Sequence, residues 1–190
     1  MAYKDILVEA QGEIGSITLN SPSTVNALSK NIISEVIVAL EELAANTALK
    51  VIILKANGKH FCAGHYLKEM IDGNVTEYRF IFNQCSTMMK LIHQVPQVVI
   101  AQVHGVATAA GCQMVGTCDL AVADVTARFG TPGVRIGLFC TTPMVALSRA
   151  VGRKLAMEML MTGRLISADE ALHHGLVNRV VPEEELDKTV

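Results

Sequence analysis

The chain has 190 residues, of which 51% are hydrophobic and 18% are charged, and this length and composition predict one domain over residues 1–190 with a well-buried core. Its 16 Lys and Arg against 18 Asp and Glu leave a formal net charge of −2, which excludes the strongly basic surface typical of proteins that bind nucleic acid or anionic membranes. No apolar run in the sequence reaches transmembrane length. We therefore expect neither a nucleic-acid partner nor a membrane partner.

The five cysteines are odd in number, irregularly spaced and mostly set in apolar surroundings. This pattern is typical of reduced thiols in a protein core. No C-x-x-C pair suggests zinc, so we expect no metal site. The first ten residues lack the apolar stretch of a secretion signal and the Arg-rich character of a mitochondrial transit peptide. Together these features predict a cytoplasmic protein.

The first part of the chain alternates between strand and helix patterns. Residues 4–20 predict a β-hairpin that turns at Gln11–Gly12. Ser29 is expected to cap a helix over residues 30–46, where apolar residues recur at helical spacing. The run 49–56 is too uniformly apolar for a half-exposed strand, and it predicts a strand buried on both faces.

The remainder of the chain repeats this alternation. A helix is expected over residues 77–93, and Pro96 separates it from a second buried strand over 97–103. Ser167 and Glu170 predict a capping box at the start of a later helix. The other expected elements are a turn and helix over 104–118, a strand over 119–123, helices over 141–152, 153–163 and 168–175, and a strand over 176–181. Buried strands separated by helices predict an α/β core.

Two strand exits are rich in small residues: "HFCAGHYL" at 60–67 and "HGVATAAGC" at 104–112. Small residues allow other atoms to approach the main chain closely. Because a helix is expected after each exit, free N–H groups and positive helix ends could converge on one anionic oxygen. Paired N–H donors of this kind form an oxyanion hole, in which each donor contributes roughly two to three orders of magnitude in rate.

At these residues the sequence resembles the crotonase, or enoyl-CoA hydratase/isomerase, superfamily. The resemblance implies a ClpP-like spiral of ββα turns with two stacked sheets, acyl-CoA thioester substrates, and a homo-oligomer that is a trimer or hexamer. Coenzyme A would then be part of the substrate, with no separate cofactor. The matching stretches occur in the family's order and cover nearly the whole chain; they begin with "LNSPSTVNALS", "GKHFCAGHYLKEM", "QVVIAQVHGVATAAGCQMVG" and "RAVGRKLAMEMLMTGRLISADEALHHG".

The resemblance also implies specific site residues. The two family donors to the thioester oxygen correspond to the main-chain N–H groups of His65 and Ala110. Alanine at 110 replaces the more usual glycine, which is compatible with the site if φ is negative there. The loop expected to contact the adenine and pantetheine of coenzyme A comprises Ala63, His65, Tyr66, Leu67 and Lys68, with Ala110 contributed by the second exit.

Two departures from the family pattern bear on the reaction. Hydratases of this family carry two glutamates that activate water and protonate the α-carbon, and the matching residues here are Gln113 and Gly133. An amide does not usefully accept a proton and glycine has no side chain, so the paired general acid and base are absent. The resemblance therefore implies an acyl-CoA lyase or isomerase of fatty acid metabolism whose chemistry is not standard hydration.

Other functions remain open at this stage. The "AGH" of residues 63–65 is also similar to crotonases that decarboxylate methylmalonyl-CoA, although those enzymes have a tyrosine where this chain has Cys140. The substitutions as a set most resemble the enoyl-CoA hydratase domain-containing proteins. The alternatives are a decarboxylase or isomerase in which His65 donates a proton, a residual hydratase in which Gln113 positions water, and a non-catalytic acyl-CoA-binding protein. The candidate catalytic residues are His65, Ala110, Gln113 and Cys140, the last favoured as a thiol of the pocket wall.

Members of the family continue past the position of Val190 into a helical segment that covers the acyl-CoA site and joins the subunits. We therefore expect this C-terminal helical segment to be truncated or missing here. Without it, apolar side chains of the core helices would form an exposed patch, a feature that usually marks an interface. This again predicts an oligomer.

Overall fold

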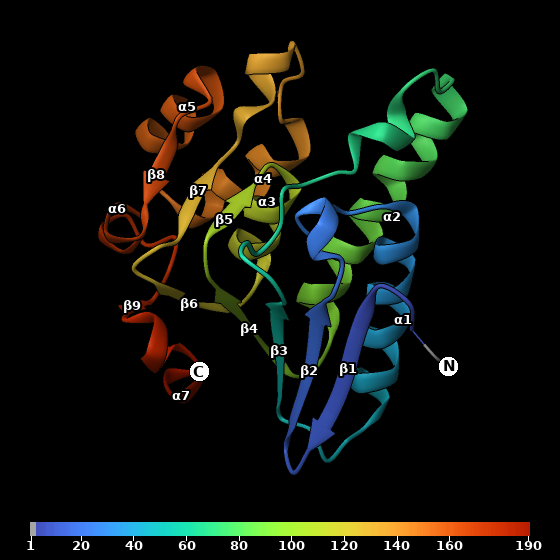
Figure 1. Cartoon of the computed structure of the whole chain (residues 1–190), viewed down its shortest axis with the longest axis vertical. Coiled ribbons are helices and arrows are strands. Elements are labelled where there is room, and N and C mark those ends of the chain that lie inside the picture. Colours follow the sequence, from blue (N-terminus) through green and yellow to red (C-terminus); the bar gives the residue numbers. More distant parts are fainter. Residues whose placement is uncertain (1–2) are drawn as a thin grey trace.

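The computed structural model describes residues 3–190 as two β-sheets with helices packed around them (Figure 1). The larger sheet contains, in spatial order, β1 (Ile6–Gln11), β2 (Ile14–Leu19), β3 (Val51–Ala56), β4 (Val98–Val103), β6 (Leu120–Asp124) and β9 (Arg179–Val181). The smaller sheet contains β5 (Val106–Thr108), β7 (Arg128–Gly130) and β8 (Leu165–Ser167). From β2 to β9 all neighbouring strands of the larger sheet are parallel.

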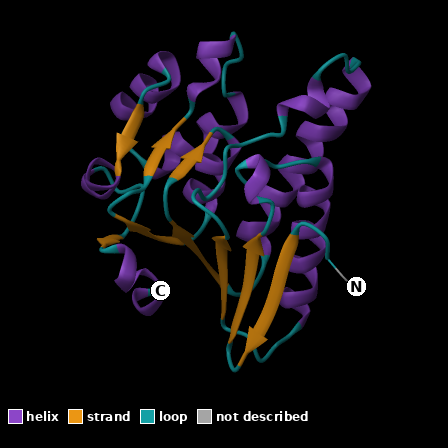
Figure 2. Cartoon of the chain, in the orientation of Figure 1, coloured by secondary structure: helices purple, strands orange, loops and turns teal. Residues whose placement is uncertain are grey.

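Within the described residues, seven α-helices connect and cover these strands (Figure 2). They are α1 (Lys30–Ala45), α2 (Val75–Gln94), α3 (Ala110–Thr117), α4 (Thr141–Ala150), α5 (Arg153–Thr162), α6 (Ala168–His173) and α7 (Leu186–Thr189). Short 3₁₀ helices are η1 (Pro22–Thr24), η2 (Leu67–Met70), η3 (Pro132–Ile136) and η4 (Glu183–Glu185). None of the helices within residues 3–190 is both long enough and apolar enough to cross a lipid bilayer.

The predicted hairpin and the first helix cap are confirmed. Strands β1 and β2 pair antiparallel and turn at Gly12, whose φ of +59° is a conformation that glycine adopts at little cost. The Ser29 side chain accepts a hydrogen bond from the N–H of Ile32 at 3.1 Å, which satisfies one of the free donors at the start of α1.

Strand β3 differs from the prediction. Ile52 and Leu54 are buried, whereas Val51 and Ile53 are only partly buried. The reason is that α1 and α2 cover one face of the larger sheet, so the side chains of β3 that point to the other face stay partly exposed (Figure 1). The expectation that this strand is buried on both faces was wrong.

Helix capping explains two further differences. Helix α2 begins before the predicted start because Asn74 and Glu77 form a reciprocal capping box, with the Asn74 side chain accepting from the Glu77 N–H and the Glu77 carboxylate accepting from the Asn74 N–H. Ser167 does cap α6 by accepting from the Glu170 N–H at 3.1 Å. The Glu170 carboxylate instead pairs with Arg164, so the predicted box is only half formed.

The family resemblance implies a second sheet, but the sequence pattern did not predict the strands of the smaller sheet. Its strands β5, β7 and β8 have three residues each, too few to show a strand period. Its first strand, β5, lies inside the stretch 104–118 that was expected to be only a turn and a helix. This sheet matters for function because β5 leads directly into α3 at one of the two strand exits.

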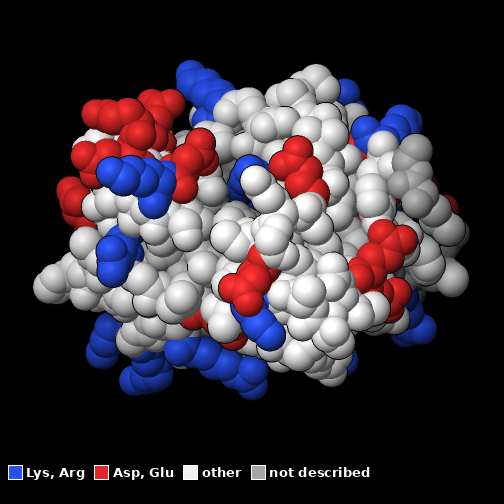
Figure 3. Space-filling model, turned by 90° about the horizontal axis from the view of Figure 1, so that it is seen from below, with Lys and Arg blue, Asp and Glu red and all other residues white. Residues whose placement is uncertain are grey.

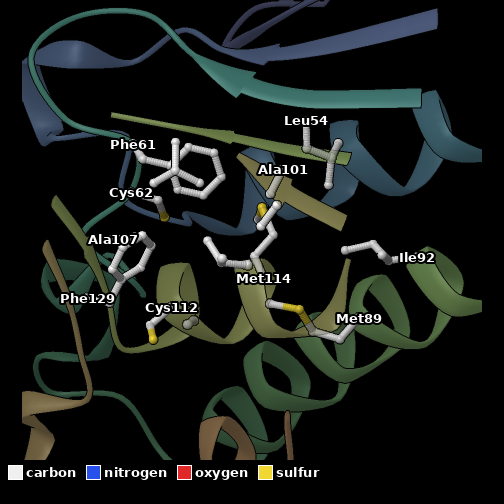
Figure 4. Close-up of a cluster of buried hydrophobic side chains, with 14 of the residues drawn as sticks. Leu54, Phe61, Cys62, Met89, Ile92, Ala101, Ala107, Cys112, Met114 and Phe129 are labelled. Atoms are coloured by element: carbon white, nitrogen blue, oxygen red, sulfur yellow. The ribbon is translucent and has the colours of Figure 1, made fainter. Parts of the chain in front are cut away.

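A continuous buried core packs strands of the larger sheet against the helices and reaches the smaller sheet and both strand exits (Figure 4). Phe61 and Cys62, in the loop after β3, are fully buried, and they pack with Phe129 of β7 and Met114 of α3. The first exit is therefore held in the core immediately before the residues of interest.

On the face drawn in Figure 3, acidic side chains gather at the upper left with basic side chains among them, basic side chains line the lower left edge, and most of the remaining surface is uncharged.

Candidate active site

The two strand exits run side by side and are joined by main-chain hydrogen bonds. The Cys62 N–H donates to the Val106 carbonyl at 3.0 Å, and the Thr108 N–H donates to the Cys62 carbonyl at 2.9 Å. The Thr108 hydroxyl adds a bond to the Ala63 carbonyl at 3.2 Å. Cys62 and Ala107 thus form a parallel bridge that fixes the register of the two exits.

Both exits then turn through uncommon backbone conformations. Gly64 has a φ of +93°, and Ala109 has φ +50° and ψ −118°. A Cβ atom on Gly64 would lie 2.7 Å from the Ala109 Cβ and 3.1 Å from the Ala110 nitrogen, so the exits touch at this point and only glycine fits. Ala109 carries the strain, which typically costs about 1–3 kcal/mol for such a conformation. Ala110 itself is the first residue of α3 and does not have a positive φ.

The main-chain N–H groups of His65 and Ala110 find no acceptor anywhere in residues 3–190. Their neighbours do: the Tyr66 N–H donates to the Leu28 carbonyl at 3.1 Å, and the Ala109 N–H donates to the Gly130 carbonyl at 2.9 Å. Ala110 is buried and His65 is half-buried, and because buried N–H groups are nearly always paired, these unpaired donors distinguish the site. The Ala110 donor also lies at the positive end of α3.

His65 and Ala110 both line a cavity of about 760 Å³. We call Ala63–His65 together with Ala109–Ala110 the donor wall. A second part of the lining, Pro132–Pro143, runs from η3 into α4, and we call it the η3–α4 wall. No aspartate or glutamate lines the cavity in the described part of the chain. The large apolar side chains of the lining are Leu67, Met70, Phe82, Ile136, Leu138 and Phe139.

The imidazole of His65 lies in apolar surroundings. Its ring packs edge-on against that of Phe82, with 5.2 Å between ring centroids and 65° between ring planes. Its Nε2 atom is buried and has no hydrogen-bond partner. Burial lowers the pKa of His65 because the charged form loses hydration that nothing replaces. The burial therefore favours the neutral form of the ring.

The η3–α4 wall contributes a thiol without activating it. Cys140 immediately precedes α4 and is 7% exposed. Burial raises the pKa of the Cys140 thiol, and a hydrogen bond from the Gly133 main chain opposes this effect only in part. A thiol that stays protonated is a poor nucleophile. This geometry supports a role for Cys140 in the pocket wall.

Gly133, where the hydratases have a glutamate, is tightly enclosed. A Cβ atom there would lie 2.2 Å from the Leu138 carbonyl oxygen and 2.7 Å from the Cys140 sulfur. The Leu138 N–H also donates to the Gly133 carbonyl at 2.9 Å, which closes the turn around this residue. The tight backbone around Gly133 therefore leaves no space for the side chain of a glutamate.

Among the residues singled out in the sequence, Ala63, His65, Leu67, Ala110 and Cys140 line one cavity. Gln113, Tyr66 and Lys68 do not contribute to that lining. Gln113 is 7% exposed and its Oε1 is buried and unpaired, and the residue lines a separate depression of about 490 Å³ between α2, α3 and α4. Its role in positioning water remains a prediction.

Sequence reasoning missed most of the apolar lining. Phe82 and Met70 come from the region between the two exits, and nothing in their spacing distinguishes them from ordinary core or surface residues. Ala109 was also missed, although the "TAAGC" run in which it lies was recognised. Residues 3–190 contain no group of three or more His, Cys, Asp or Glu side chains placed to hold a metal ion.

Comparisons with known proteins agree with this architecture. Residues 9–190 match the family model described as Enoyl-CoA hydratase/isomerase. Enoyl-CoA hydratase domain-containing protein 3 of Mus musculus is 49% identical over 178 residues, which is 93% of this chain and 59% of the mouse protein. The solved structure of the human protein of the same name has a TM-score of 0.95 at 46% identity, covering 98% of this chain and 74% of that one. An enoyl-CoA hydratase of Mycobacterium smegmatis has a TM-score of 0.96 at 47% identity, covering 98% and 73%.

These matches confirm the predicted fold class and correct the predicted location. The relatives from mouse, rat, Xenopus laevis and human are all named as mitochondrial proteins, which overturns the cytoplasmic expectation drawn from the composition of the first ten residues. The chain spans 58% to 63% of the length of the vertebrate relatives that it matches.

Proposed function

Because the chain belongs to the enoyl-CoA hydratase/isomerase family, we propose that it binds acyl-CoA thioesters and stabilises the enolate of the thioester between the N–H groups of His65 and Ala110. One observation carries the proposal: two neighbouring main-chain donors, each without an acceptor in residues 3–190, line the same cavity. Coenzyme A enters as part of the substrate, and its contacts would come from the loop Ala63–Lys68.

The chemistry follows from where charge develops. When the α-carbon of an acyl-CoA loses a proton or a carboxyl group, the electron pair left behind delocalises onto the thioester oxygen. Two fixed N–H donors and the positive end of α3 stabilise that oxygen without having to reorganise. The apolar lining strengthens these interactions because it excludes water from the site.

Standard hydration is not part of the proposal. No carboxylate of the described residues lines the cavity, and Gly133 has no room for a side chain. The neutral imidazole of His65 is the titratable group on the donor wall, so we assign it any proton transfer at the α-carbon in a lyase or isomerase reaction. Decarboxylation needs no base, and a residual hydratase would have to use Gln113.

Non-catalytic acyl-CoA binding is a second candidate function. It is supported by the same absence of carboxylates in the described lining, since a protein that only binds thioesters needs the two donors but no general base. The donor wall is compatible with either function. The two are separated by whether a bound acyl-CoA exchanges its α-hydrogen.

Isothermal titration with butyryl-CoA and free coenzyme A tests the ligand class, and the proposal requires the thioester to bind more tightly. In D₂O, a working enolate-forming catalyst incorporates deuterium at the α-carbon of bound butyryl-CoA, whereas a binder does not. CO₂ release from a malonyl-type thioester then identifies a decarboxylase. If butyryl-CoA and free coenzyme A bind equally, the thioester oxygen has no partner and the proposal fails.

We also propose that the chain assembles as a homotrimer or a pair of trimers. Large apolar side chains are exposed beside the cavity, and such patches usually mark interfaces. Size-exclusion chromatography with light scattering should show an oligomer at micromolar concentration, and a monomer would contradict this. The exposed residues are Leu67 (49%), Ile71 (66%), Val75 (63%), Phe80 (55%) and Ile136 (63%).

A further inference from the structure

A second hollow adjoins the cavity. It is the depression of about 490 Å³ between α2, α3 and α4, which we call the α2–α4 depression. Thr142, in the first turn of α4, belongs to the linings of both hollows. On α3, Ala110 lines the cavity and Gln113 lines the depression. The two hollows are therefore neighbours along α3 and the start of α4.

Gln113 occupies the boundary between them from the side of α3. It lies three residues beyond Ala110, about 4.5 Å along the helix axis and on nearly the same face. Side chains of a helix lean toward its N-terminus, so the Gln113 side chain leans back toward the cavity. The residue is 7% exposed and its Oε1 is buried. The side chain is therefore packed into the boundary and does not stand free in either hollow.

The inner part of the α2–α4 depression is suited to an apolar chain. Its lining includes Met89, Val115 and Leu176, which are all buried, whereas Lys90 and Arg149 are exposed. A hydrocarbon chain that reached the buried part would remove methylene groups from water, and each buried methylene strengthens binding about fourfold. This gain is available only to a chain that passes the boundary.

We infer that Gln113 and Thr142 set the longest acyl chain that the cavity accepts, because they close it off from the α2–α4 depression. The inference rests on the proposed function, since it takes the thioester carbonyl to lie against the donor wall at Ala110. An acyl chain that extends from there along α3 meets Gln113 after about one helical turn, which leaves room for only a few carbons. Shortening the Gln113 side chain opens the depression to longer chains.

Isothermal titration with butyryl-, hexanoyl-, octanoyl- and decanoyl-CoA tests this limit. For the wild type, affinity should rise by about fourfold per methylene until the chain meets the boundary, and it should stop rising before decanoyl-CoA. Gln113→Ala removes every side-chain atom beyond Cβ. Its affinity should continue to rise through the series, so that it binds decanoyl-CoA about tenfold more tightly than octanoyl-CoA.

Three further variants identify the boundary and the depression as the cause. Gln113→Met conserves the volume of the side chain without its amide, and it should keep the wild-type limit. Ala146 lines the depression but not the cavity, so adding Ala146→Phe to Gln113→Ala should fill the depression and cancel the gain. Ser148→Phe is the matched control on the same helix, because Ser148 is exposed and lies outside both linings. Added to Gln113→Ala, it should leave the gain intact.

A second route to the same result covers a failure to fold. If Gln113→Ala is not folded by circular dichroism, Thr142→Ala shortens the boundary from the side of α4. It should also extend the series of chain lengths over which affinity rises.

The outcomes separate the inference from the proposed function. If the wild type binds butyryl-CoA no better than free coenzyme A, the proposed function itself fails. If wild-type affinity rises steadily to decanoyl-CoA, or if Gln113→Ala stops rising at the wild-type length, the limit set at Gln113 is overturned while the thioester site stands. A gain that survives Ala146→Phe overturns the assignment of the α2–α4 depression to the longer chain.

Discussion

The two walls of the cavity differ in which part of the chain would perform the proposed function. On the donor wall the proposed active groups belong to the main chain, and they depend on the turns at Gly64 and Ala109 that bring the exits together. On the η3–α4 wall, function in the hydratases depends on a side chain, and here the position holds Gly133. A backbone site tolerates changes of side chain such as the alanine at 110. A side-chain site is lost by one substitution.

Removing a donor should have the largest effect on the donor wall. Ala110→Pro deletes the N–H at the first position of α3, where proline fits a helix. We expect α-hydrogen exchange or turnover to fall by roughly two to three orders of magnitude, because one oxyanion donor is lost. Ala110→Gly keeps the N–H and should retain the wild-type rate. Unchanged exchange in a natively folded Ala110→Pro protein would show that this amide does not contact the thioester oxygen.

A substitution that forces the two exits apart should have the next largest effect. Two glycines of α3 provide a test variant and its matched control. A Cβ on Gly111 would lie 2.3 Å from the Cys62 carbonyl oxygen, whereas a Cβ on Gly116 has no atom nearer than 3.7 Å. Gly111→Ala should lower the free energy of unfolding by about 1–3 kcal/mol through overpacking and weaken acyl-CoA binding. Gly116→Ala should raise it by up to about 1 kcal/mol, since alanine favours helix. Urea unfolding measures both, and equal effects would mean that the exits are not in close contact.

Introducing a glutamate at position 133 in the η3–α4 wall should not restore hydratase activity. In Gly133→Glu the new Cβ meets the Leu138 carbonyl, so the turn must move. We expect no crotonyl-CoA hydration and a loss of about 1–3 kcal/mol in the free energy of unfolding. The control is Gly152→Glu, where a Cβ meets no atom within 4 Å, and it should change stability by less than about 0.5 kcal/mol. Hydration by a stable Gly133→Glu protein would show that one side chain is all that the wall lacks.

The sequence predicts the features that depend on neighbouring residues better than the features that depend on the fold. The caps at Ser29 and Ser167 and the long strands were readable because they depend on residues near each other in sequence. The identity of the two donor amides came from the family resemblance, and the observed pairing of Cys62 with Ala107 explains why those amides meet. A second sheet was expected from the resemblance, but its strands could not be located from the sequence pattern, because three-residue strands have no period and depend on their partners. The separation of Gln113 from the cavity likewise depends on helix packing that spacing does not encode.

The smallest expected effect concerns the ring of His65 and the pH dependence of stability. The unfolded chain titrates this histidine near its ordinary pKa of about 6.5, while burial lowers its pKa in the folded protein. As pH falls through and below about 6.5, the unfolded state therefore binds the proton first, and the free energy of unfolding decreases by up to about 1.4 kcal/mol per pH unit for one such group. Above that range the full stability is present.

The comparison with His65→Phe isolates this contribution, because every other titrating group is common to both proteins. Urea unfolding is measured at pH 7.5, 6.5 and 5.5, a range that spans the ordinary histidine pKa of about 6.5. As the pH falls, the free energy of unfolding should decrease more steeply for the wild type than for the variant. Parallel curves would mean that the ring is as well solvated in the folded protein as in the unfolded chain. A ring with that hydration would not lie in the apolar contact with Phe82 whose burial accounts for the lowered pKa of His65.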